Sequence, residues 1–462
     1  MSVWTLDAPT GASALVAADG RHFTYGELAD GSDRFACALT PSPSKTVGFV
    51  LCRNTPECVM AYLGALRAGQ AVCLLDVDLR AELLERLVST YRPDWIFTPD
   101  DKALAGYAQS SDVHGHLLRR QAADAEQPVS ADLAVLLPTS GTTGSPRLVR
   151  LSHQNLLANA DAIVRYLGLT PDERGLASLP MSYSYGLSIL HAHLHAGATV
   201  LLTTASFMQR EYWAFINEQK PTSLSGVPYH YDVMLRMGML RRELPSLRTL
   251  TQAGGRLDAE RVAQLEQMSA DRGWRFFVMY GQTEASPRIS YVPPERLREK
   301  SGSIGIPIPG GQLELDADTG ELIYSGPNVM LGYAESRDDL SKGDELGGRL
   351  RTGDLARRDA DGYYYIVGRA KRFLKVFGKR VSLDEVETLV TQYGGGAAAC
   401  VGEDDRVRIA VEDASVGEAA SRVMVDILKI HPSAFRVRTV DALPRFPSGK
   451  LDYQTVSSLE GW

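Results

Sequence analysis

Short apolar runs alternate with amphipathic segments along the first part of the chain. Residues 47–52 and 71–76 are apolar runs of strand length, and residues 23–39 and 60–69 have the spacing of helices. Repeated alternation of strand and helix predicts a mostly parallel sheet with helices on its faces. Residues 100–130 are polar and weakly patterned, so we expect a connector there.

The alternation continues beyond residue 130. Residues 151–169 have the pattern of an amphipathic helix, and a second helical run follows Gly186. Apolar runs of strand length come next, and several end in small or polar residues; they are residues 198–204, 222–228, 247–255 and 275–286. Because the carboxyl ends of parallel strands lie at one edge of a sheet, we expect these polar ends to converge on one crevice.

The pattern changes at Gly302. Residues 312–316 alternate between polar and apolar with a period of two, and a predicted turn joins them to a second strand-like run. A second hairpin is predicted for residues 354–368, with its turn at residues 359–362. The rest of the chain mixes a helix and strands, so the whole sequence predicts an α/β protein with a β-rich segment.

Composition narrows the class of protein. The chain has 462 residues, of which 44% are hydrophobic and 23% charged, and its formal net charge is −7. This charge argues against a nucleic-acid or anionic-membrane surface, so we expect neither partner. The first residues lack a signal-peptide pattern, no run is long enough to span a membrane, and the five cysteines form no CxxC pair. We therefore expect a cytoplasmic protein.

The segment LLPTSGTTGSPR, residues 136–147, is the first candidate for chemistry. Its glycines allow close approach of backbone N–H groups, its hydroxyls add donors, and Arg147 adds charge, which suits a bound phosphate. The alternative is an ordinary surface turn. The segment lacks the Gly-Lys-Ser/Thr of a Walker loop, and it does not have the dinucleotide pattern GxGxxG.

Other polar residues are candidates that are weak when each is considered alone. Glu284 offers a hard oxygen ligand for Mg²⁺, Asp354 is a plausible acceptor for a ribose diol, and Lys450 lies in a Pro/Ser/Gly-rich loop. Their alternatives are a solvated acid and a solvated tail lysine. His191 and His195 share a helix face, but no cysteine or carboxylate follows nearby, so we favour ordinary helix histidines over a metal site.

Five segments together resemble a known family; they are residues 139–144 (TSGTTG), 280–284 (YGQTE), 351–354 (RTGD), 368–371 (GRAK) and 447–450 (PSGK). Their residues and order resemble the adenylate-forming superfamily, which includes acyl-CoA synthetases, adenylation domains of peptide synthetases, and luciferases. The resemblance covers essentially the whole chain. It implies that a carboxylate attacks the α-phosphate of ATP, giving acyl-AMP and pyrophosphate, and that a thiol then attacks the acyl-adenylate.

The resemblance also implies a domain organisation. Residues 1–369 would form a large multi-sheet α/β adenylation domain that binds ATP and the acid and contains a small β-rich subdomain. Residues 370–462 would form a small mobile α+β lid that carries Lys450. The hinge between the two would lie near Lys371. A mobile lid is expected because the lysine is needed in one half-reaction and must leave room for the thiol in the other.

Roles for single residues follow from the same resemblance. Catalysis would fall to Lys450, Glu284 and Thr283, with Glu284 as the Mg²⁺ ligand. The nucleotide would contact Thr139, Ser140, Gly141, Thr142, Thr143, Gly144, Arg147, Gly254, Gly255, Tyr280, Gly281, Asp354 and Arg369. Because a carboxylate is already ionised at neutral pH, the chemistry needs no general base, but it does need cations that offset the repulsion between two anions.

The sequence departs from the family pattern at three places. Arg147 stands where the family usually has Lys. The final motif of the family usually runs on to Arg, whereas here Leu451 follows Lys450. Ser184 stands where amino-acid-activating members have an Asp that pairs with the substrate ammonium. Because burying an unpaired ammonium is costly, we expect an aryl or acyl acid without an α-amino group. Its pocket would include Tyr183, Tyr185, Val227 and Pro228.

The thiol acceptor stays open at this stage. CoA is our first expectation, which makes the chain an acid–thiol ligase that uses ATP, Mg²⁺ and CoA. The alternatives are transfer to the phosphopantetheine arm of an acyl carrier protein, an enzyme that stops at the adenylate, and a binding protein without catalysis.

Overall fold

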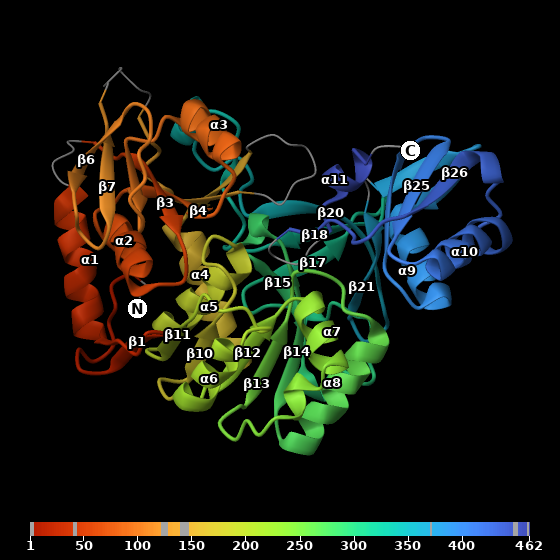
Figure 1. The fold of residues 1–462 in the computed structure, drawn as a ribbon, viewed down its shortest axis with the longest axis horizontal. Coiled ribbons are helices and arrows are strands. Elements are labelled where there is room, and N and C mark those ends of the chain that lie inside the picture. The colour runs from red at the N-terminus through yellow and green to blue at the C-terminus, as the bar shows by residue number, and fades with distance from the viewer. Residues whose placement is uncertain are drawn as a thin grey trace.

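The computed structural model of the chain describes residues 4–39, 44–121, 128–138, 147–369, 372–446, 451–459 and 462. Two large β-sheets with helices between and around them form most of the molecule, and a small sheet with its own helices lies at the C-terminal end (Figure 1). This arrangement confirms the predicted α/β class.

The first large sheet combines the strands between residues 174 and 307 with the two N-terminal strands. In spatial order its strands are β16 (Ile306–Pro307), β15 (Arg288–Val292), β14 (Arg275–Gly281), β13 (Thr249–Gln252), β12 (Ser223–Gly226), β10 (Arg174–Ala177), β11 (Thr199–Leu202), β1 (Ser13–Ala17) and β2 (His22–Thr24). The strands from β14 to β1 run parallel, whereas β15 returns antiparallel to β14. The four predicted runs with polar ends are β11, β12, β13 and β14, as expected.

The second large sheet combines the strands between residues 47 and 152 with β19 from later in the chain. Its strands in spatial order are β19 (Gly332–Ala334), β9 (Leu148–Ser152), β8 (Leu133–Pro138), β4 (Ala71–Asp76), β3 (Val47–Cys52), β5 (Trp95–Thr98), β7 (His116–Arg120) and β6 (Tyr107–Ser111). β8, β4, β3 and β5 are parallel, and β9 and β19 continue the sheet in antiparallel pairs.

The prediction of a connector at residues 100–130 was wrong, because β6 and β7 form a hairpin at the edge of the second sheet. β7 buries Leu117 and Leu118 beside β5, whereas most of β6 is exposed to solvent. A mostly exposed edge strand needs little apolar sequence, which explains why the pattern was polar.

Helices separate the two sheets and cover their outer faces (Figure 1). They are α1 (Tyr25–Leu39), α2 (Pro56–Arg67), α3 (Ala81–Tyr91), α4 (His153–Leu167), α5 (Ser184–His195), α6 (Arg210–Gln219), α7 (Pro228–Arg236) and α8 (Ala259–Arg272). α4 packs on β8 and β9 and against α5, which packs on β10 and β11. α4 begins at Ser152, whose hydroxyl accepts the Asn155 N–H at 3.0 Å in a capping box.

Alternate residues of the central strands face different hydrophobic cores. On β3, Val50 lies in the core between the sheets, whereas Phe49 lies in the outer core that α3 covers. On β11, Leu202 faces the first of these cores and Leu201 faces the core under α6, α7 and α8. Because both faces of these strands are buried, their sequences are continuous apolar runs rather than alternating ones.

The C-terminal third of the chain contains the smaller sheets. The β-rich segment is an antiparallel sheet of β17 (Gln312–Leu315), β18 (Glu321–Ser325), β20 (Arg349–Arg358) and β21 (Tyr364–Arg369). The remaining elements are β22 (Phe373–Val376), β23 (Lys379–Ser382), α9 (Leu383–Gly394), β24 (Ala398–Glu403), β25 (Arg406–Val411), α10 (Ala414–Arg422), β26 (Phe435–Thr439) and α11 (Tyr453–Ser457).

Among the described residues, no hydrophobic cluster mixes side chains from before residue 370 with side chains from after residue 371. Lys371 itself lies outside the described residues, and the division into two domains about this hinge stays a prediction.

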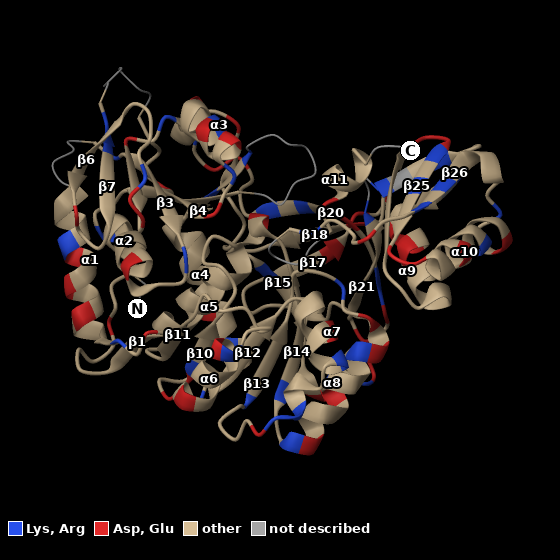
Figure 2. Cartoon of the chain, in the orientation of Figure 1, with Lys and Arg blue, Asp and Glu red and all other residues tan. Residues whose placement is uncertain are grey.

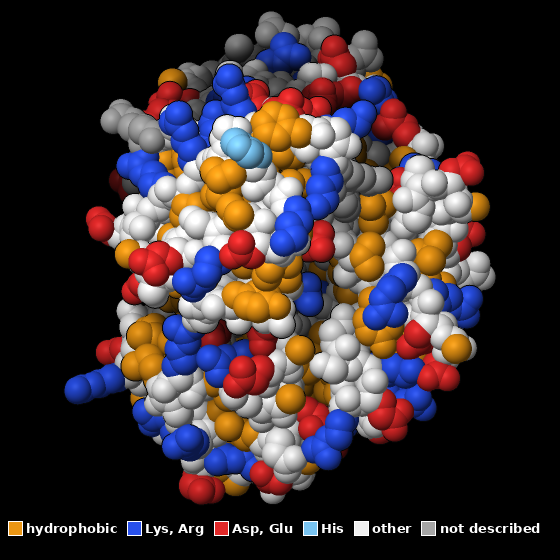
Figure 3. All heavy atoms as spheres, turned by 90° about the vertical axis from the view of Figure 1, so that its right-hand side faces the viewer, with side chains coloured by type: hydrophobic (Ala, Val, Ile, Leu, Met, Phe, Trp, Pro, Cys, Tyr) orange, Lys and Arg blue, Asp and Glu red, His pale blue; other side chains and the backbone are white. Residues whose placement is uncertain are grey.

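Charged side chains are spread over the surface. Lysine and arginine side chains gather on β25 and β26 of the C-terminal sheet (Figure 2). Seen from that side of the molecule, acidic, basic and hydrophobic side chains are intermixed (Figure 3). Within the described ranges, no helix has both the length and the apolar character needed to cross a membrane.

Candidate active site

The carboxylate of Asp354 lies between two donors from different strands. The pairing of β20 with β21 places Asp354 opposite Arg369, and Arg369 Nε donates to Asp354 Oδ1 at 3.1 Å. From the end of β14, the Tyr280 hydroxyl donates to Asp354 Oδ2. Asp354 is buried, and burial raises its pKa while Arg369 and Tyr280 lower it. These two donors hold the carboxylate in one orientation.

Neighbouring bonds make this part of the site rigid. Burial and the nearby Asp354 both raise the pKa of Tyr280 well above its ordinary value, so the phenol stays protonated and donates. The Thr352 hydroxyl donates to the Leu322 carbonyl at 2.7 Å and accepts the Asp354 N–H at 3.2 Å. The predicted RTGD segment is therefore tied to β18 as well as to β14.

Glu284 lies just beyond β14, in a short 3₁₀ turn (Thr283–Ala285), and is half-buried. Its Oε1 accepts the Tyr333 hydroxyl at 2.8 Å, and among the described residues no donor reaches its Oε2. The guanidinium of Arg147 lies over the Tyr333 ring, 3.7 Å from its centroid. Tyr333 therefore connects Glu284 to the end of the Gly/Thr-rich segment.

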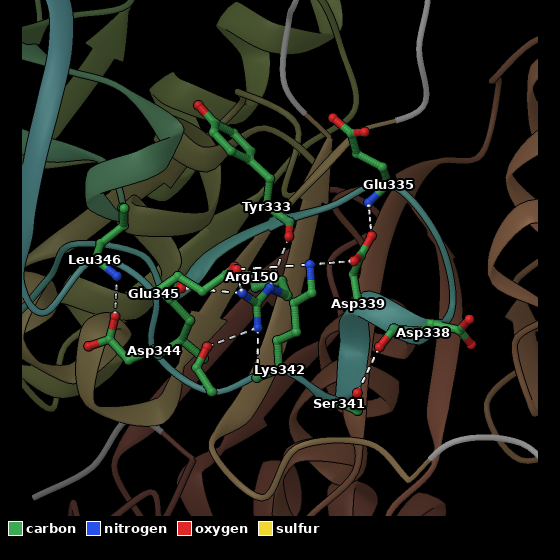
Figure 4. A network of polar contacts seen from close by, with 12 residues as sticks. Arg150, Tyr333, Glu335, Asp338, Asp339, Ser341, Lys342, Asp344, Glu345 and Leu346 are labelled. Atoms are coloured by element: carbon green, nitrogen blue, oxygen red, sulfur yellow. Dashed lines mark hydrogen bonds and ion pairs between the residues drawn. The ribbon is translucent and has the colours of Figure 1, made fainter.

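Arg150 fixes the position of Tyr333 (Figure 4). The side chain of Arg150 is fully buried. It donates to the Tyr333 carbonyl at 3.1 Å and the Leu331 carbonyl at 3.3 Å, and it pairs with Glu345. Sequence reasoning missed both Arg150 and Tyr333. The only signal for Arg150 is an arginine inside an otherwise apolar strand, LVRLS.

The residues predicted to line the acid pocket lie together. A Cβ placed on Gly254 would come within 2.5 Å of the Tyr183 hydroxyl and 3.2 Å of Val227 Cγ1, so these groups lie directly over this glycine. A Cβ placed on Gly255 would approach Pro228 Cγ at 3.2 Å. Tyr185 packs edge-to-face on Tyr183, with ring centroids 6.3 Å apart.

Ser184 connects this pocket to the Glu284 turn. It is the first residue of α5, it is buried, and its hydroxyl lies 3.1 Å from the Thr283 hydroxyl. Gly281 at the end of β14 has Pro287 O only 1.9 Å from the position of a Cβ, so no larger residue fits there without movement. Gly281, Thr283 and Glu284 thus lie at the carboxyl end of β14 and directly after it, where a polar strand end was predicted.

Several predicted site residues lie outside the described part of the chain. They are Thr139, Ser140, Gly141, Thr142, Thr143, Gly144 and Lys450. The ends of the Gly/Thr-rich segment are described, and Pro138 on β8 pairs with Leu148 on β9. The segment therefore connects two adjacent antiparallel strands.

One of the helix histidines, His191, makes a structural contact. His191 is buried, its Nε2 lies 2.8 Å from the Tyr62 hydroxyl, and burial lowers its pKa to about 3. Within the described ranges no cluster of histidine, cysteine and acidic side chains could hold a metal ion.

Comparisons with known proteins find relatives over most of the chain. A family model described as AMP-binding enzyme matches residues 4–334. Feruloyl-CoA synthase from Amycolatopsis sp is 30% identical over 431 residues, which cover 88% of this chain and 84% of that protein. The L-proline–[L-prolyl-carrier protein] ligase from Pseudomonas fluorescens is 30% identical over 411 residues, covering 83% of this chain and 79% of that protein.

Solved structures share the whole fold. The o-succinylbenzoate CoA synthetase from Bacillus subtilis, in complex with its acyl-adenylate intermediate, is 23% identical with a TM-score of 0.79, covering 100% of this chain and 99% of that chain. The same enzyme in complex with ATP and a magnesium ion is 25% identical with a TM-score of 0.77, and the match covers 97% of both chains. The likeness over the full length confirms the predicted fold class.

Asp354→Asn tests the raised pKa of this buried carboxyl. The folded protein holds the Asp354 proton more tightly than the unfolded chain, so its contribution to stability is present below the ordinary pKa of 3.8 and is lost as pH rises through the folded-state value. We therefore expect the melting temperature of Asp354→Asn, relative to wild type, to rise as the pH increases above the ordinary pKa of 3.8.

Asp316→Asn is the matched control, with the opposite sign. Bonds from Thr319 and Arg351 lower the pKa of Asp316 to about 2, so its stabilising contribution is present at neutral pH and is lost as pH falls. The melting temperature of this variant, relative to wild type, should fall as pH rises. The same pH trend for both variants would contradict the burial argument.

Proposed function

Since the chain belongs to the AMP-binding enzyme family, we propose that it activates an aryl or acyl carboxylic acid with ATP and then forms a thioester with CoA. In the first step an acid oxygen bonds to the α-phosphate and pyrophosphate leaves. In the second step a thiol sulfur bonds to the acyl carbon and AMP leaves. Adenylate formation and ligase chemistry follow from the family, whereas the acid and the acceptor are our proposal.

The observation that supports the nucleotide side of this proposal is the carboxylate of Asp354, fixed by Tyr280 and Arg369. An ionised carboxylate only accepts hydrogen bonds, so Asp354 suits the two ribose hydroxyls of ATP. Gly254 and Gly255 have no side chains between the backbone and a flat ring, so they would lie against adenine or the acyl group.

Glu284 fits the role of magnesium ligand. Tyr333 holds one of its oxygens at 2.8 Å, and no donor of the described residues takes the other. A free, hard carboxylate oxygen is the ligand type that Mg²⁺ prefers, and the bound ion would supply charge that offsets the phosphates. Arg147 keeps a positive charge where the family usually has Lys, and with residues 139–144 it would hold the β- and γ-phosphates.

The proposed cycle also needs a cation at the α-phosphate and a moving lid. Lys450 would supply the ammonium group in the first step. Residues 370–462 would then rotate about a hinge near Lys371 so that the thiol can approach. Support for separate movement is that, among the described residues, no hydrophobic cluster crosses this boundary.

The acid is proposed to lack an α-amino group. Ser184 stands where amino-acid-activating members have Asp, and its hydroxyl faces Thr283 at 3.1 Å rather than a carboxylate. A substrate ammonium beside it would be buried without a counter-ion, which is costly. Tyr183, Tyr185, Val227 and Pro228 would line the pocket for the rest of the acid.

The relatives differ in the thiol acceptor that their names give. One relative is named a feruloyl-CoA synthase, and another is named a ligase for a prolyl carrier protein. We choose CoA and keep transfer to a carrier-protein phosphopantetheine arm, or an enzyme that stops at the adenylate, as alternatives.

A direct test is pyrophosphate release over a panel of aryl, short acyl and amino acids, followed by thioester detection with CoA and with a holo-carrier protein. We expect release with aryl or acyl acids and thioester formation with CoA. Turnover with the carrier but not with CoA would overturn our acceptor. Absence of release with every acid would overturn acid activation itself.

Lys450→Ala separates the two half-reactions. Because the ammonium is needed only where charge develops at the α-phosphate, adenylation should fall by about 100- to 1000-fold. Transfer of the acyl group from supplied acyl-AMP to the thiol should be largely kept, as measured by thioester formation in single-turnover assays. Equal loss of both half-reactions would contradict the role proposed for Lys450.

Tyr333→Phe tests the support of Glu284. The variant keeps the ring under Arg147 but removes the hydroxyl that orients the carboxylate. Loss of such a supporting bond typically weakens metal affinity about 10- to 100-fold, so the Mg²⁺ concentration for half-maximal adenylation should rise by a similar factor. Tyr365→Phe, on the β21 side of the site and bonded to Asp359 at 3.2 Å, is the control and should leave the Mg²⁺ requirement unchanged.

A further inference from the structure

Arg288 is a buried arginine without an acidic partner. It begins β15, and only 4% of its surface is exposed. Among the described residues it forms no ion pair, and its Nε has no hydrogen-bond partner. Because a buried cation without a counter-ion is costly, a protein retains one where something else supplies the negative charge.

The structure fixes Arg288 beside the proposed acid pocket. β15 pairs antiparallel with β14 so that Arg288 lies opposite Gly281, directly after the turn that carries Glu284. The Arg288 carbonyl accepts Asn328 Nδ2 at 2.8 Å, which anchors the backbone. The guanidinium lies over the ring of Tyr185, 4.2 Å from its centroid.

The neighbouring phenols cannot balance this charge. Burial raises the pKa of both Tyr166 and Tyr183 to about 12, although the nearby Arg288 lowers them, so both stay neutral at physiological pH. The Tyr185 hydroxyl lies 2.9 Å from both the carbonyl and the hydroxyl of Thr251. The rings therefore shape an apolar wall around the guanidinium and leave its charge without a partner.

We propose that Arg288 binds a second anionic group of the substrate, so that the enzyme activates acids with a carboxylate remote from the reacting one. This inference rests on the proposed acid activation. The reacting carboxylate would lie towards Glu284 and Lys450, and the remote carboxylate would lie against the guanidinium, whose planar donors match it in a bidentate pair. Arg288 would also repel a substrate ammonium, in agreement with Ser184.

The test compares acids in matched pairs. Each dicarboxylic acid of a panel, from short aliphatic diacids to the phthalate isomers, is measured beside its monoamide, which has the same shape without the second charge. For the best diacid we expect wild type to prefer it over its monoamide by about 100-fold in kcat/KM for pyrophosphate release. In Arg288→Met this ratio should fall to near one, mostly through KM.

Arg275→Met is the control for loss of an arginine on the neighbouring strand, at the end of β14 away from Gly281. Arg275 lies on β14, its guanidinium is 5.7 Å from the Phe277 ring centroid, and it donates to Thr249 Oγ1 at 3.1 Å. This variant should keep the wild-type ratio. If Arg288→Met does not fold, the wild-type ratio decides by itself, and Arg288→Lys, which keeps the charge but loses the planar fork, should reduce the ratio only in part.

The outcomes separate this inference from the proposed function. Pyrophosphate release that is as fast with monoamides as with diacids would overturn the role of Arg288 and leave acid activation standing. Release with no acid at all would overturn acid activation. In that case a thermal-shift measurement still tests the role of Arg288. A diacid should raise the melting temperature of wild type but not that of Arg288→Met. If no diacid of the panel raises the melting temperature of wild type, the inference is overturned.

Discussion

The fully buried guanidinium of Arg150 is the constraint on which the geometry around Glu284 depends. Its N–H groups donate to carbonyls at both ends of the segment from Leu331 to Gly343 and to the carboxylate of Glu345. Arg150 therefore holds β19 against β9, although the two strands are far apart in the sequence. Since Tyr333 belongs to β19, the bond that orients Glu284 depends on Arg150, a side chain that does not itself bond Glu284.

The buried charges of this chain differ in how completely the protein satisfies them. Arg150 has partners for all of its nitrogens and acts as a structural tie. Asp354 has two donors, which leaves acceptor capacity on both oxygens for a ligand. Arg288 has an aromatic ring but no anion. Because desolvating a charge is costly, this difference supports a structural role for Arg150 and supports the proposal that Asp354 and Arg288 bind ligand groups.

The sequence predicted the parts of the site that depend on local motifs better than the parts that depend on distant pairing. Sequence pattern and motifs predicted the strand end at Tyr280 and Glu284 and the hairpin that carries Asp354. They did not predict the pairing of Asp354 with Arg369, because a register shift between Leu355 and Ala356 brings Arg369, rather than Gly368, opposite the carboxylate. A sequence pattern does not show where such a bulge falls.

Two strand arginines also have surroundings that the local sequence does not predict. Arg150 lies within the apolar strand LVRLS and Arg288 begins the strand RISYV, and the sequence does not show that their surroundings differ. Their difference arises from residues far along the chain, because segment 331–345 meets Arg150 whereas tyrosines of α4 and α5 surround Arg288. The edge hairpin of β6 and β7 was missed for a related reason, since an exposed strand is defined by its neighbour rather than by its own hydrophobicity.

The contacts between the main body and the C-terminal elements bear on the proposed rotation. The Arg369 N–H donates to Asp384 at 3.1 Å, and Arg256 donates to Thr388 at 3.4 Å. Exposed polar contacts of this kind contribute little to stability, so exchanging them would cost little. Arg369 also bonds Asp354, so this carboxylate, which is proposed to bind ribose, is connected through Arg369 to Asp384 of α9. Rotation near Lys371 would therefore divide no hydrophobic cluster of the described residues, and it would break the contact between Arg369 and Asp384.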